Sequence, residues 1–302
     1  MESTLDISVI ISTYGNNDGV IRLNKILGAL RDQKIEEDIN YEVIVVDNGL
    51  SLNKNILLDE YSEIKNLVII GEPKIGLSGA RNKGILNAKG SILAFTDDDI
   101  MPHMEWLSSL YRSHHESDFL CVGGPVILQN DEQSFPEWFS DYFLRFLLPP
   151  KFPEKFGTIS QPFYLIGANM SFKKIAFRKY GLFDTSLGRK GNCLLSGEDT
   201  EFILRLDKND ICYNPNAKVS TKIKSDRLTK RFFLKRIFWQ AVSDARIFRK
   251  HGLSGFYDFN EVFLSDKFLK NFYKVLTQGD FFKLGCIIIR FLTFKFFLVF
   301  KL

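Results

Sequence analysis

Apolar runs alternate with helically spaced segments along the first hundred residues of this chain. The continuous apolar runs, which predict buried strands, are 7–13, 41–46, 67–70 and 91–96. The segments between them, where apolar residues recur at helical spacing, predict helices over 19–33, 53–63 and 78–88. Strands that alternate with helices predict an α/β fold with a doubly wound, mostly parallel sheet flanked by helices.

The regular alternation ends after residue 101. The later segments with helical spacing are 104–116, 174–180 and 197–206, and those that resemble strands are 119–128 and 163–172. Residues 130–162 form a predicted loop region rich in Pro and Phe, and residues 184–196 form a second, Gly-containing loop. From about residue 228 onward the pattern is helical, which predicts a C-terminal helical extension.

Polar side chains follow three of the predicted strands at the points where the strands end. They are Thr13, Asp47 and the triplet Asp97-Asp98-Asp99. In doubly wound sheets the ligand binds beyond the carboxyl ends of the strands, so these residues are candidates for a site. Three adjacent carboxylates repel one another, and a divalent cation such as Mg²⁺ or Mn²⁺ relieves that repulsion. The alternative is a solvated acidic turn.

The charge is divided unevenly along the chain, although the formal net charge is only +4. Residues 222–302 contain 17 Lys and Arg against 6 Asp and Glu, a net charge of +11, so residues 1–221 have a net charge of −7. An acidic body with a basic tail is typical of a protein that rests on an anionic surface. Little polar surface suited to reading bases accompanies the basic residues, so we expect no nucleic-acid partner.

The last segment, 281–302, is strongly apolar, but Arg290 and Lys295 interrupt it. An uncharged span long enough for a transmembrane helix is therefore absent from this segment, and an interfacial helix with snorkelling basic residues fits better. The alternative is a helix that docks on the body or on a partner in a homodimer. The first residues lack the apolar segment of a signal peptide. We therefore expect a cytoplasmic protein, peripheral at the inner face of the cell membrane.

Four motifs occur in a fixed order, with a Gly-rich segment among them. The motifs are Ser12-Thr13-Tyr14, Val45-Val46-Asp47-Asn48-Gly49, Thr96-Asp97-Asp98-Asp99 and Gly197-Glu198-Asp199, and the segment is Gly76-Leu77-Ser78-Gly79-Ala80-Arg81-Asn82. Their order and spacing resemble those of the family 2 glycosyltransferases, over roughly residues 5–245. The resemblance implies a GT-A fold and an inverting hexosyltransferase-like enzyme of the bacterial surface-polysaccharide type. It also implies a catalytic domain over 1–225, with a nucleotide-binding half (1–100) and an acceptor half (101–225), followed by a basic, aromatic helical region (226–302).

The resemblance assigns donor-binding roles to residues from several segments, namely Thr13, Tyr14, Asp47, Gly76, Arg81, Asp97 and Asn169. Asp47 would contact the nucleobase, and its alternative is an Asp that caps a turn. Arg81 would reach a phosphate from the first turn of a helix capped by Ser78, and its alternative is an exposed helical Arg. Asn169 would line the cleft for donor and acceptor, and its alternative is a turn-forming Asn at a strand end.

The resemblance also implies metal and catalytic roles for the remaining acidic residues of the motifs. Asp98 and Asp99 would bind Mn²⁺ or Mg²⁺ at the diphosphate, with Asp97 turned toward the sugar or ribose. Asp199 would be the general base for the acceptor hydroxyl, and Glu198 would orient the acceptor or support the loop. The alternative for this second pair is structural, because Ser196-x-x-Asp199 also matches a capping box.

One departure from the family concerns residues 219–224, just before Arg227-Leu228-Thr229. Many members carry a histidine there that in some is a further metal ligand, whereas this chain has Val-Ser-Thr-Lys-Ile-Lys. Lys222 could neutralise phosphate instead. The sequence therefore predicts a metal-dependent transferase that moves sugar from a nucleoside diphosphate sugar, with UDP favoured, to a glycan or lipid-linked glycan. The alternatives are an inactive, nucleotide-binding membrane scaffold and a nucleotidyltransferase.

Overall fold

The computed structural model of the chain describes nine stretches of residues. They are 5–14, 16–36, 39–64, 66–129, 135–148, 154–159, 165–252, 272–273 and 275–300. The chain divides into two compact units, which are treated separately below. Unit 1 comprises Met1–Gln133, Leu148–Ser186 and Glu198–Lys222. Unit 2 comprises Ser134–Leu147, Leu187–Gly197 and Ile223–Leu302.

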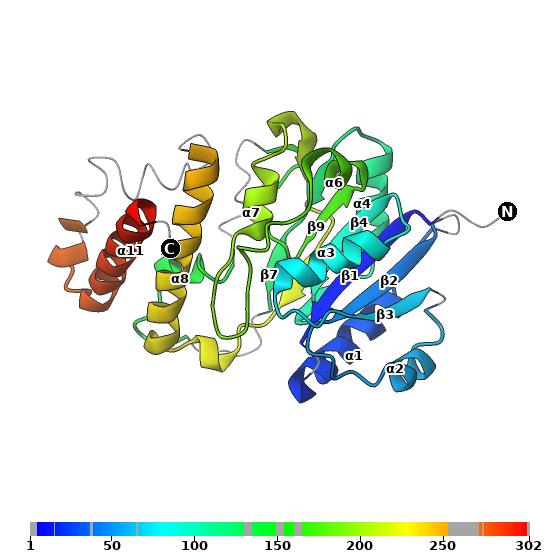
Figure 1. Ribbon diagram of the computed structural model, residues 1–302, viewed down its shortest axis with the longest axis horizontal. Helices are drawn as coiled ribbons and strands as arrows, with labels where there is room; N and C mark the ends of the chain where they lie inside the picture. Colours follow the sequence, from blue (N-terminus) through cyan, green and yellow to red (C-terminus); the bar gives the residue numbers. More distant parts are fainter. Residues whose placement is uncertain are drawn as a thin grey trace. The chain divides into compact units, whose positions relative to one another are not determined.

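Unit 1 is built on a mostly parallel sheet that contains eight strands among the described residues, in the order β3-β2-β1-β4-β9-β6-β10-β8. The strands of this sheet are β1 (Ile7–Thr13), β2 (Tyr41–Asp47), β3 (Leu67–Gly71), β4 (Ile92–Asp97), β6 (Cys121–Gly123), β8 (Gly157–Thr158), β9 (Met170–Lys173) and β10 (Ile211–Tyr213). The strands β1 to β4 follow the predicted apolar runs, and they can be traced in Figure 1.

The register of the central strands brings the candidate residues to one edge of the sheet. Strand β1 pairs in parallel with β2 and β4, which places Thr13 opposite Asp47 and Ser12 opposite Asp97. Strand β9 runs antiparallel to β4, so its first residue, Met170, lies opposite Phe95 near the same edge. Three parallel strands therefore end together, as the doubly wound pattern predicts.

Helices cover both faces of this sheet. Those of unit 1 are α1 (Asn17–Arg31), α2 (Lys54–Glu60), α3 (Leu77–Asn87), α4 (Trp106–His115), α6 (Ile175–Tyr180) and α7 (Glu198–Ile203), with the 3-10 turn η2 (Lys208–Asp210). Apolar residues of α1, α2 and α4 pack in one core with Val9 and Val43, and those of α3, α6 and α7 pack in a second core with Ile10 and Ile44. Alternate residues of a strand point to opposite faces, so these two cores lie on opposite sides of the sheet.

A second, three-stranded sheet in unit 1 corrects one sequence prediction. Its strands are β5 (Ile100–Pro102), β7 (Val126–Leu128) and β11 (Val219–Thr221), in the order β5-β11-β7. Residues 119–128 were predicted as one strand, but they form β6 and β7 in different sheets. Gly124 makes the crossing possible, because a Cβ there would lie 2.0 Å from the carbonyl oxygen of Ala217.

Unit 2 contains the long helices of the C-terminal extension. Its described helical elements are α5 (Asp141–Leu144), η3 (Ser225–Arg227), α8 (Lys230–His251) and α11 (Phe281–Val299). Helix α8 begins after Thr229, whose hydroxyl accepts from the N–H of Phe232, and a cluster centred on Phe143, Phe233 and Cys286 joins α5, α8 and α11. A buried ion pair between Arg290 and Asp244 also links α11 to α8.

The predicted fold class is confirmed by a mostly parallel sheet with flanking helices and a helical extension. No helix in the described residues is long and apolar enough to cross a membrane. The domain division at residue 225 stays a prediction.

Candidate active site

The edge where β1, β2 and β4 end is the candidate site in unit 1. Thr13 and Asp47 are buried there, and Tyr14 is exposed. The Thr13 hydroxyl donates to Oδ2 of Asp98 at 2.6 Å, so the first and third motifs are in direct contact. Contact of Thr13 and Tyr14 with a donor stays a prediction.

Asp98 is neutralised by a protein cation that the sequence analysis missed. Arg22 of α1 donates from Nε to Oδ1 of Asp98 at 3.0 Å and from Nη2 to Oδ2 at 3.2 Å. The pKa of Arg22 is raised, because its interactions with Asp98 outweigh the effect of burial. Arg22 is one of several basic residues in α1, and no motif in the sequence distinguishes it from the others.

Asp47 caps the turn that follows β2. Its Oδ1 accepts from the N–H of Gly49 at 3.1 Å and its Oδ2 from the N–H of Leu52 at 2.9 Å. The turn-capping interpretation is therefore confirmed, and the contact with a nucleobase stays a prediction. The neighbouring Asn48, which sequence reasoning also missed, donates to the carbonyl oxygens of Glu72 and Lys74.

Gly76 shapes the start of α3. Its N–H donates to Oδ1 of Asn48 at 2.7 Å, and its φ of +154° lies in a region that favours glycine. The helix begins at Leu77 with Gly76 in the capping position and no side-chain cap. The prediction that Ser78 caps this helix is therefore wrong, because Ser78 already lies inside the first turn.

Arg81 lies buried between two carboxylates, with 2% of its side chain exposed. Its Nη2 donates to Oδ1 of Asp97 at 2.9 Å, and its Nη1 donates to Oε1 of Glu198 at 2.7 Å. Burial lowers the pKa of Arg81, but the surrounding carboxylates produce a net rise. The alternative of an exposed helical Arg is wrong, and the predicted contact with a phosphate stays a prediction.

The two carboxyl groups paired with Arg81 are shifted toward their protonated forms. The pKa of Glu198 is raised to about 7, because burial and the neighbouring Asp199 together outweigh the opposing effect of Arg81. Burial also raises the pKa of Asp97, again against the influence of Arg81. A carboxyl with a pKa near neutrality beside a candidate base is typical of catalytic sites.

Asp199 is held by backbone N–H groups at the start of α7. Its Oδ2 accepts from the N–H of Gly167 at 2.7 Å, and its Oδ1 accepts from the N–H of Thr200 at 2.7 Å. A Cβ at position 167 would lie 2.3 Å from Nη1 of the buried Arg81, so glycine leaves room for the guanidinium. One residue therefore supports the candidate base and makes room for the buried guanidinium.

The capping-box alternative for this segment is wrong. Within unit 2, the hydroxyl of Ser196 donates to Gln240 and accepts from Arg236. Asp199 directs its carboxylate to Gly167 and Thr200 instead. The role of Asp199 as the general base stays a prediction.

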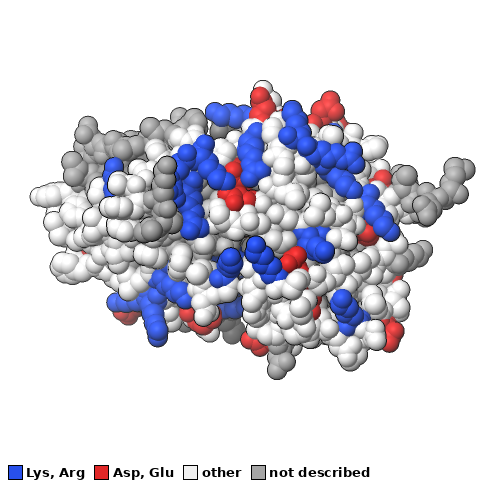
Figure 2. Space-filling model, in the orientation of Figure 1, with Lys and Arg blue, Asp and Glu red and all other residues white. Residues whose placement is uncertain are grey.

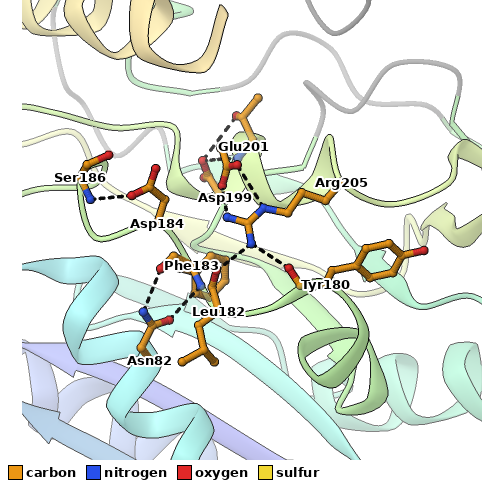
Figure 3. A network of polar contacts seen from close by, with 10 residues as sticks. Asn82, Tyr180, Leu182, Phe183, Asp184, Ser186, Asp199, Glu201 and Arg205 are labelled. Carbon is orange, nitrogen blue, oxygen red and sulfur yellow. Dashed lines mark hydrogen bonds and ion pairs between the residues drawn. The ribbon is translucent and has the colours of Figure 1, made fainter. Parts of the chain in front are cut away.

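A polar network fixes the segment beside α7 (Figure 3). Arg205 pairs with Glu201, and its Nη1 donates to the carbonyl oxygens of Tyr180 at 2.9 Å and Leu182 at 2.8 Å. The side chain of Asn82 bonds to both the N–H and the carbonyl oxygen of Phe183. These anchors were missed, because their partners are backbone atoms that no motif reveals.

Asn169 is fully buried and bonded inside the fold. Its Oδ1 accepts from Nε1 of Trp106 at 2.8 Å, and its Nδ2 donates to the carbonyl oxygens of Pro125 and Ala217. The structure thus gives Asn169 a supporting role between α4 and the crossing near Gly124. Its contact with donor or acceptor stays a prediction.

The carboxylates of the triplet suit a metal shared with a substrate. In the part of the chain that the structure describes, no group of three or more His, Cys, Asp or Glu residues is arranged to hold a metal ion. Mg²⁺ in phosphate-transfer sites is commonly bound by one or two carboxylates together with substrate phosphates, so Asp98 and Asp99 fit such a site. Of the two, Asp98 already accepts bonds from Thr13 and Arg22.

The segment that lacks the expected histidine lies directly beside the triplet. The Thr221 hydroxyl donates to the carbonyl oxygen of Asp99 at 3.2 Å, and Thr221 pairs with Ile100 in the small sheet. Lys222 is the next residue and is exposed. The structure therefore places a lysine near the site where a histidine was expected.

Comparison with known families gives one match that covers more than half of the chain. The model described as "Glycosyl transferase family 2" matches residues 8–181. The match confirms the resemblance drawn from the motifs, and with it the predicted enzyme class. The bacterial surface-polysaccharide type stays a prediction.

Several curated proteins are similar to this chain. Glucosyl-dolichyl phosphate glucuronosyltransferase of Haloferax volcanii is 27% identical over 67% of this chain and 66% of its own length. Glycosyltransferase AglE of the same organism is 38% identical over 42% of this chain and 41% of its own length. The matches thus span less than two thirds of these two relatives. The succinoglycan biosynthesis protein ExoM of Rhizobium meliloti is 26% identical over 83% of this chain and 78% of its own length.

Solved structures of TarS from S. aureus share the fold. The structure of TarS residues 1–349 has a TM-score of 0.55 at 15% identity, over 92% of this chain and 80% of that chain. The same protein in complex with UDP has a TM-score of 0.54 at 17% identity, with the same coverage. These matches support the predicted GT-A type of the sheet.

We expect Arg81→Met to destabilise unit 1 by about 3–5 kcal/mol, because it leaves the buried Glu198 and the half-buried Asp97 without their cation. Urea unfolding measures the change. Adding Glu198→Gln to Arg81→Met should recover part of the loss, since it removes one of the stranded carboxyls. Arg112→Met is the matched control, because Arg112 pairs with Glu36 at an exposed position. Equal stability of the Arg81 and Arg112 variants would contradict the central role of Arg81.

We expect Glu198→Gln to change how stability depends on pH. The pKa of Glu198 is raised from 4.5 to about 7, so folding favours its protonated form. Its contribution to the free energy of unfolding is complete below pH 4.5 and is lost as the pH rises to about 7. The wild type should therefore lose stability relative to the Gln variant across this window, in urea titrations at several pH values. A difference that stays constant over the window would show that Glu198 does not titrate there.

Proposed function

Because the chain belongs to glycosyl transferase family 2, we propose that it moves a sugar from a nucleoside diphosphate sugar to a hydroxyl group of a glycan or lipid-linked glycan, with inversion at the anomeric carbon. One observation carries this proposal. Arg81 joins Asp97, at the end of β4, to Glu198, at the start of α7. The joined segments contain the residues proposed for the donor and for the acceptor.

The proposed donor is a UDP-sugar. TarS, which shares this fold, has been solved with UDP and with UDP-GlcNAc. Thr13, Tyr14, Asp47 and Gly76 follow strand ends on the edge where such a donor would bind. Asp47 and Asn48 set the shape of this edge through their bonds to the following loops, which supports a preformed pocket for the nucleoside.

We assign metal binding to Asp99, with Asp98 as the second candidate, and Mn²⁺ or Mg²⁺ as the ion. When bound, the ion would supply Lewis-acid neutralisation of the diphosphate leaving group. Arg22 fixes the carboxylate of Asp98, and Asp97 faces the buried Arg81, so these two carboxylates have different protein cations. Lys222 follows Thr221, whose hydroxyl donates to the carbonyl oxygen of Asp99. We propose that Lys222 adds positive charge for the phosphates.

Asp199 is the proposed general base. It accepts the proton of the acceptor hydroxyl while that oxygen forms a bond to C1 of the sugar. The bond between C1 and the diphosphate breaks, and its electron pair leaves with the nucleoside diphosphate. The N–H groups of Gly167 and Thr200 hold the carboxylate in place, and the half-buried position of Asp199 leaves it open to an acceptor. Glu198 supports this position through its pair with Arg81.

We further propose a lipid-linked acceptor of the surface-polysaccharide type and a peripheral position at the inner face of the membrane. The relatives include a dolichyl phosphate glycosyltransferase and a succinoglycan biosynthesis protein. We propose 1–225 as the catalytic domain, with 226–302 as a basic, aromatic region that contacts the bilayer. Support for the contact comes from α11 in unit 2.

Helix α11 presents an exposed apolar stripe. The exposed residues follow helical spacing: Phe281, Ile288, Leu292, Phe296 and Val299. The opposite side of the helix, with Cys286 and Phe294, is buried. The exposed Lys295 can extend to lipid headgroups beside the stripe. A homodimer partner is the alternative occupant.

We expect Asp199→Asn to lower the rate of sugar transfer by about 10²–10⁴, because it removes the proton acceptor. Calorimetry should show that this variant still binds UDP in the presence of Mn²⁺, as the wild type does. By contrast, Asp99→Asn should remove the gain in UDP affinity that Mn²⁺ produces. The assay is transfer to a glycan acceptor after a screen of nucleotide sugars.

The exposed Asp59 of α2 provides the control, because Asp59→Asn should change neither quantity. Wild-type protein without metal-dependent UDP binding would contradict the donor site. Unchanged transfer by Asp199→Asn would contradict the base, even if donor binding holds.

We expect Leu292→Ser combined with Phe296→Ser to reduce vesicle flotation about 10-fold or more, because each side chain loses apolar burial in the bilayer. These residues are 59% and 47% exposed, so folding should be unaffected. Ile21→Ser with Ile56→Ser, at 58% and 59% exposure in unit 1, is the matched control. Equal flotation of both variants would contradict membrane contact, and a change in oligomeric state by light scattering would favour the dimer.

A further inference from the structure

One outer surface of unit 1 is basic and carries no acidic residue in the segments that form it. The first segment is α3 with the residues that follow it, 77–91, and the second is β9 and α6 with their flanks, 170–183. Together these segments contain seven Lys and Arg residues and neither Asp nor Glu, although Arg81 is buried in the candidate site and Lys173 pairs with Asp118. This absence is notable because residues 1–221 as a whole have a net charge of −7.

The two segments form one continuous surface. Nζ of Lys174 donates to the carbonyl oxygen of Ala88 at 2.5 Å. The backbone N–H of Lys174 donates to the carbonyl oxygen of Ser91 at 2.7 Å. The side chain of Asn82 bonds to the backbone of Phe183. The apolar residues of α3 and α6 pack in the same core, so their exposed sides point away from the same face of the sheet. Blue side chains predominate over α3 and α6 in Figure 2, which views the molecule from this side.

Two large aliphatic side chains stand out from this surface. Leu86 of α3 is 70% exposed, and Ile175 of α6 is 52% exposed. Lys89 and Arg178 are exposed beside them, and Lys83 and Lys174 are half-buried. Lys179 lies at the edge, where Asp207 and Asp210 act on it. We define the α3–α6 face as these six residues: Lys83, Leu86, Lys89, Lys174, Ile175 and Arg178.

The opposite layer of unit 1 shows that this composition is not general. Helix α1 contains Asp18 beside its basic residues, α2 contains Asp59 and Glu60, and α4 lies between Glu105 and Glu116. That layer also exposes aliphatic side chains, including Ile21 and Ile56. A single exposed aliphatic residue needs no explanation, but two on basic segments that contain no Asp or Glu are a combination that the opposite layer lacks.

We propose that the α3–α6 face of unit 1 binds the surface of an anionic lipid bilayer. The basic side chains match the negative headgroups, at about 1 kcal/mol for each Lys or Arg near the membrane. Leu86 and Ile175 enter the boundary between headgroups and acyl chains, which a soluble acidic polymer does not offer. The inference goes beyond the proposed function, because it rests neither on the transferase reaction nor on α11.

The position of the face separates it from the reaction. Ala88 and Ser91 precede β4, whereas Asp97 ends that strand, and Lys173 pairs with Ile92 at the start of β4. The end of the face marked by Lys89 and Ile175 therefore lies opposite the carboxylate edge of the sheet. We assign to this face the attachment of unit 1 to the membrane, with no part in capturing the acceptor.

Flotation with vesicles of phosphatidylcholine and phosphatidylglycerol tests the proposal on the full chain. The background carries Leu292→Ser and Phe296→Ser, so that α11 does not mask the result. The face variant carries Leu86→Ser, Lys89→Gln, Ile175→Ser and Arg178→Gln. The matched control variant, on the opposite layer, carries Ile21→Ser, Lys25→Gln, Lys54→Gln and Ile56→Ser.

The face variant should bind these vesicles about 10-fold or more weakly than the control variant, from two lost cations and two lost aliphatic contacts. Its UDP binding should match that of the control, and binding by the control variant should weaken as salt rises. Equal vesicle binding by both variants, or no binding by the unmodified background, would overturn the proposal. A selective loss of heparin binding with unchanged vesicle binding would point to an acidic polymer, and a change in oligomeric state alone would point to a second copy of the chain.

Discussion

The buried ion pairs of Arg81 are the interaction on which the arrangement of unit 1 depends. A guanidinium in the interior is costly unless carboxylates compensate it, and a buried carboxylate has the same need. Arg81 meets both requirements by contacting Asp97 and Glu198, which is 117 residues away in the sequence. Burial and the neighbouring Asp199 raise the pKa of Glu198 to about 7 even beside Arg81, so one cation does not fully offset the cost of burying this carboxyl. Glu198 can therefore change its charge near neutral pH.

The like charges of the triplet are separated by their surroundings. Asp97 faces Arg81, and Asp98 faces Arg22 and Thr13. Asp99 lies next to the small sheet, where Thr221 bonds to its backbone. Three adjacent aspartates indicated a need for positive charge, and two arginines from different helices supply part of it. The proposed metal ion would therefore be one contributor to the balance of charge at this edge, beside cations that belong to the fold.

The sequence predicted the regular part of the fold well, because continuous β-branched runs have few alternatives to buried strands. It failed where one residue decides the path of the chain. Gly124 divides residues 119–128 between two sheets, and Gly76 replaces Ser78 at the start of α3. Both corrections depend on how closely the backbone approaches other groups, which apolar spacing does not encode.

The motifs predicted which residues gather at the site but not how they bond. The roles of Arg22, Asn48, Asn82 and Arg205 come from contacts across long stretches of sequence, often to backbone atoms. Asp47 and Asn169 were selected for ligands, and the structure shows that both also hold the scaffold. A motif marks a position that the fold cannot vary freely, and chemistry and architecture both impose that restriction.

Gly167 has a consequence for how this scaffold can diversify. Its N–H orients Asp199, and its missing side chain admits Arg81. A larger residue at this position would press on the guanidinium of Arg81. It would also displace the Gly167 N–H that donates to the carboxylate of Asp199. A substitution at position 167 would therefore disturb the orientation of Asp199 and the charge balance around Arg81 at once.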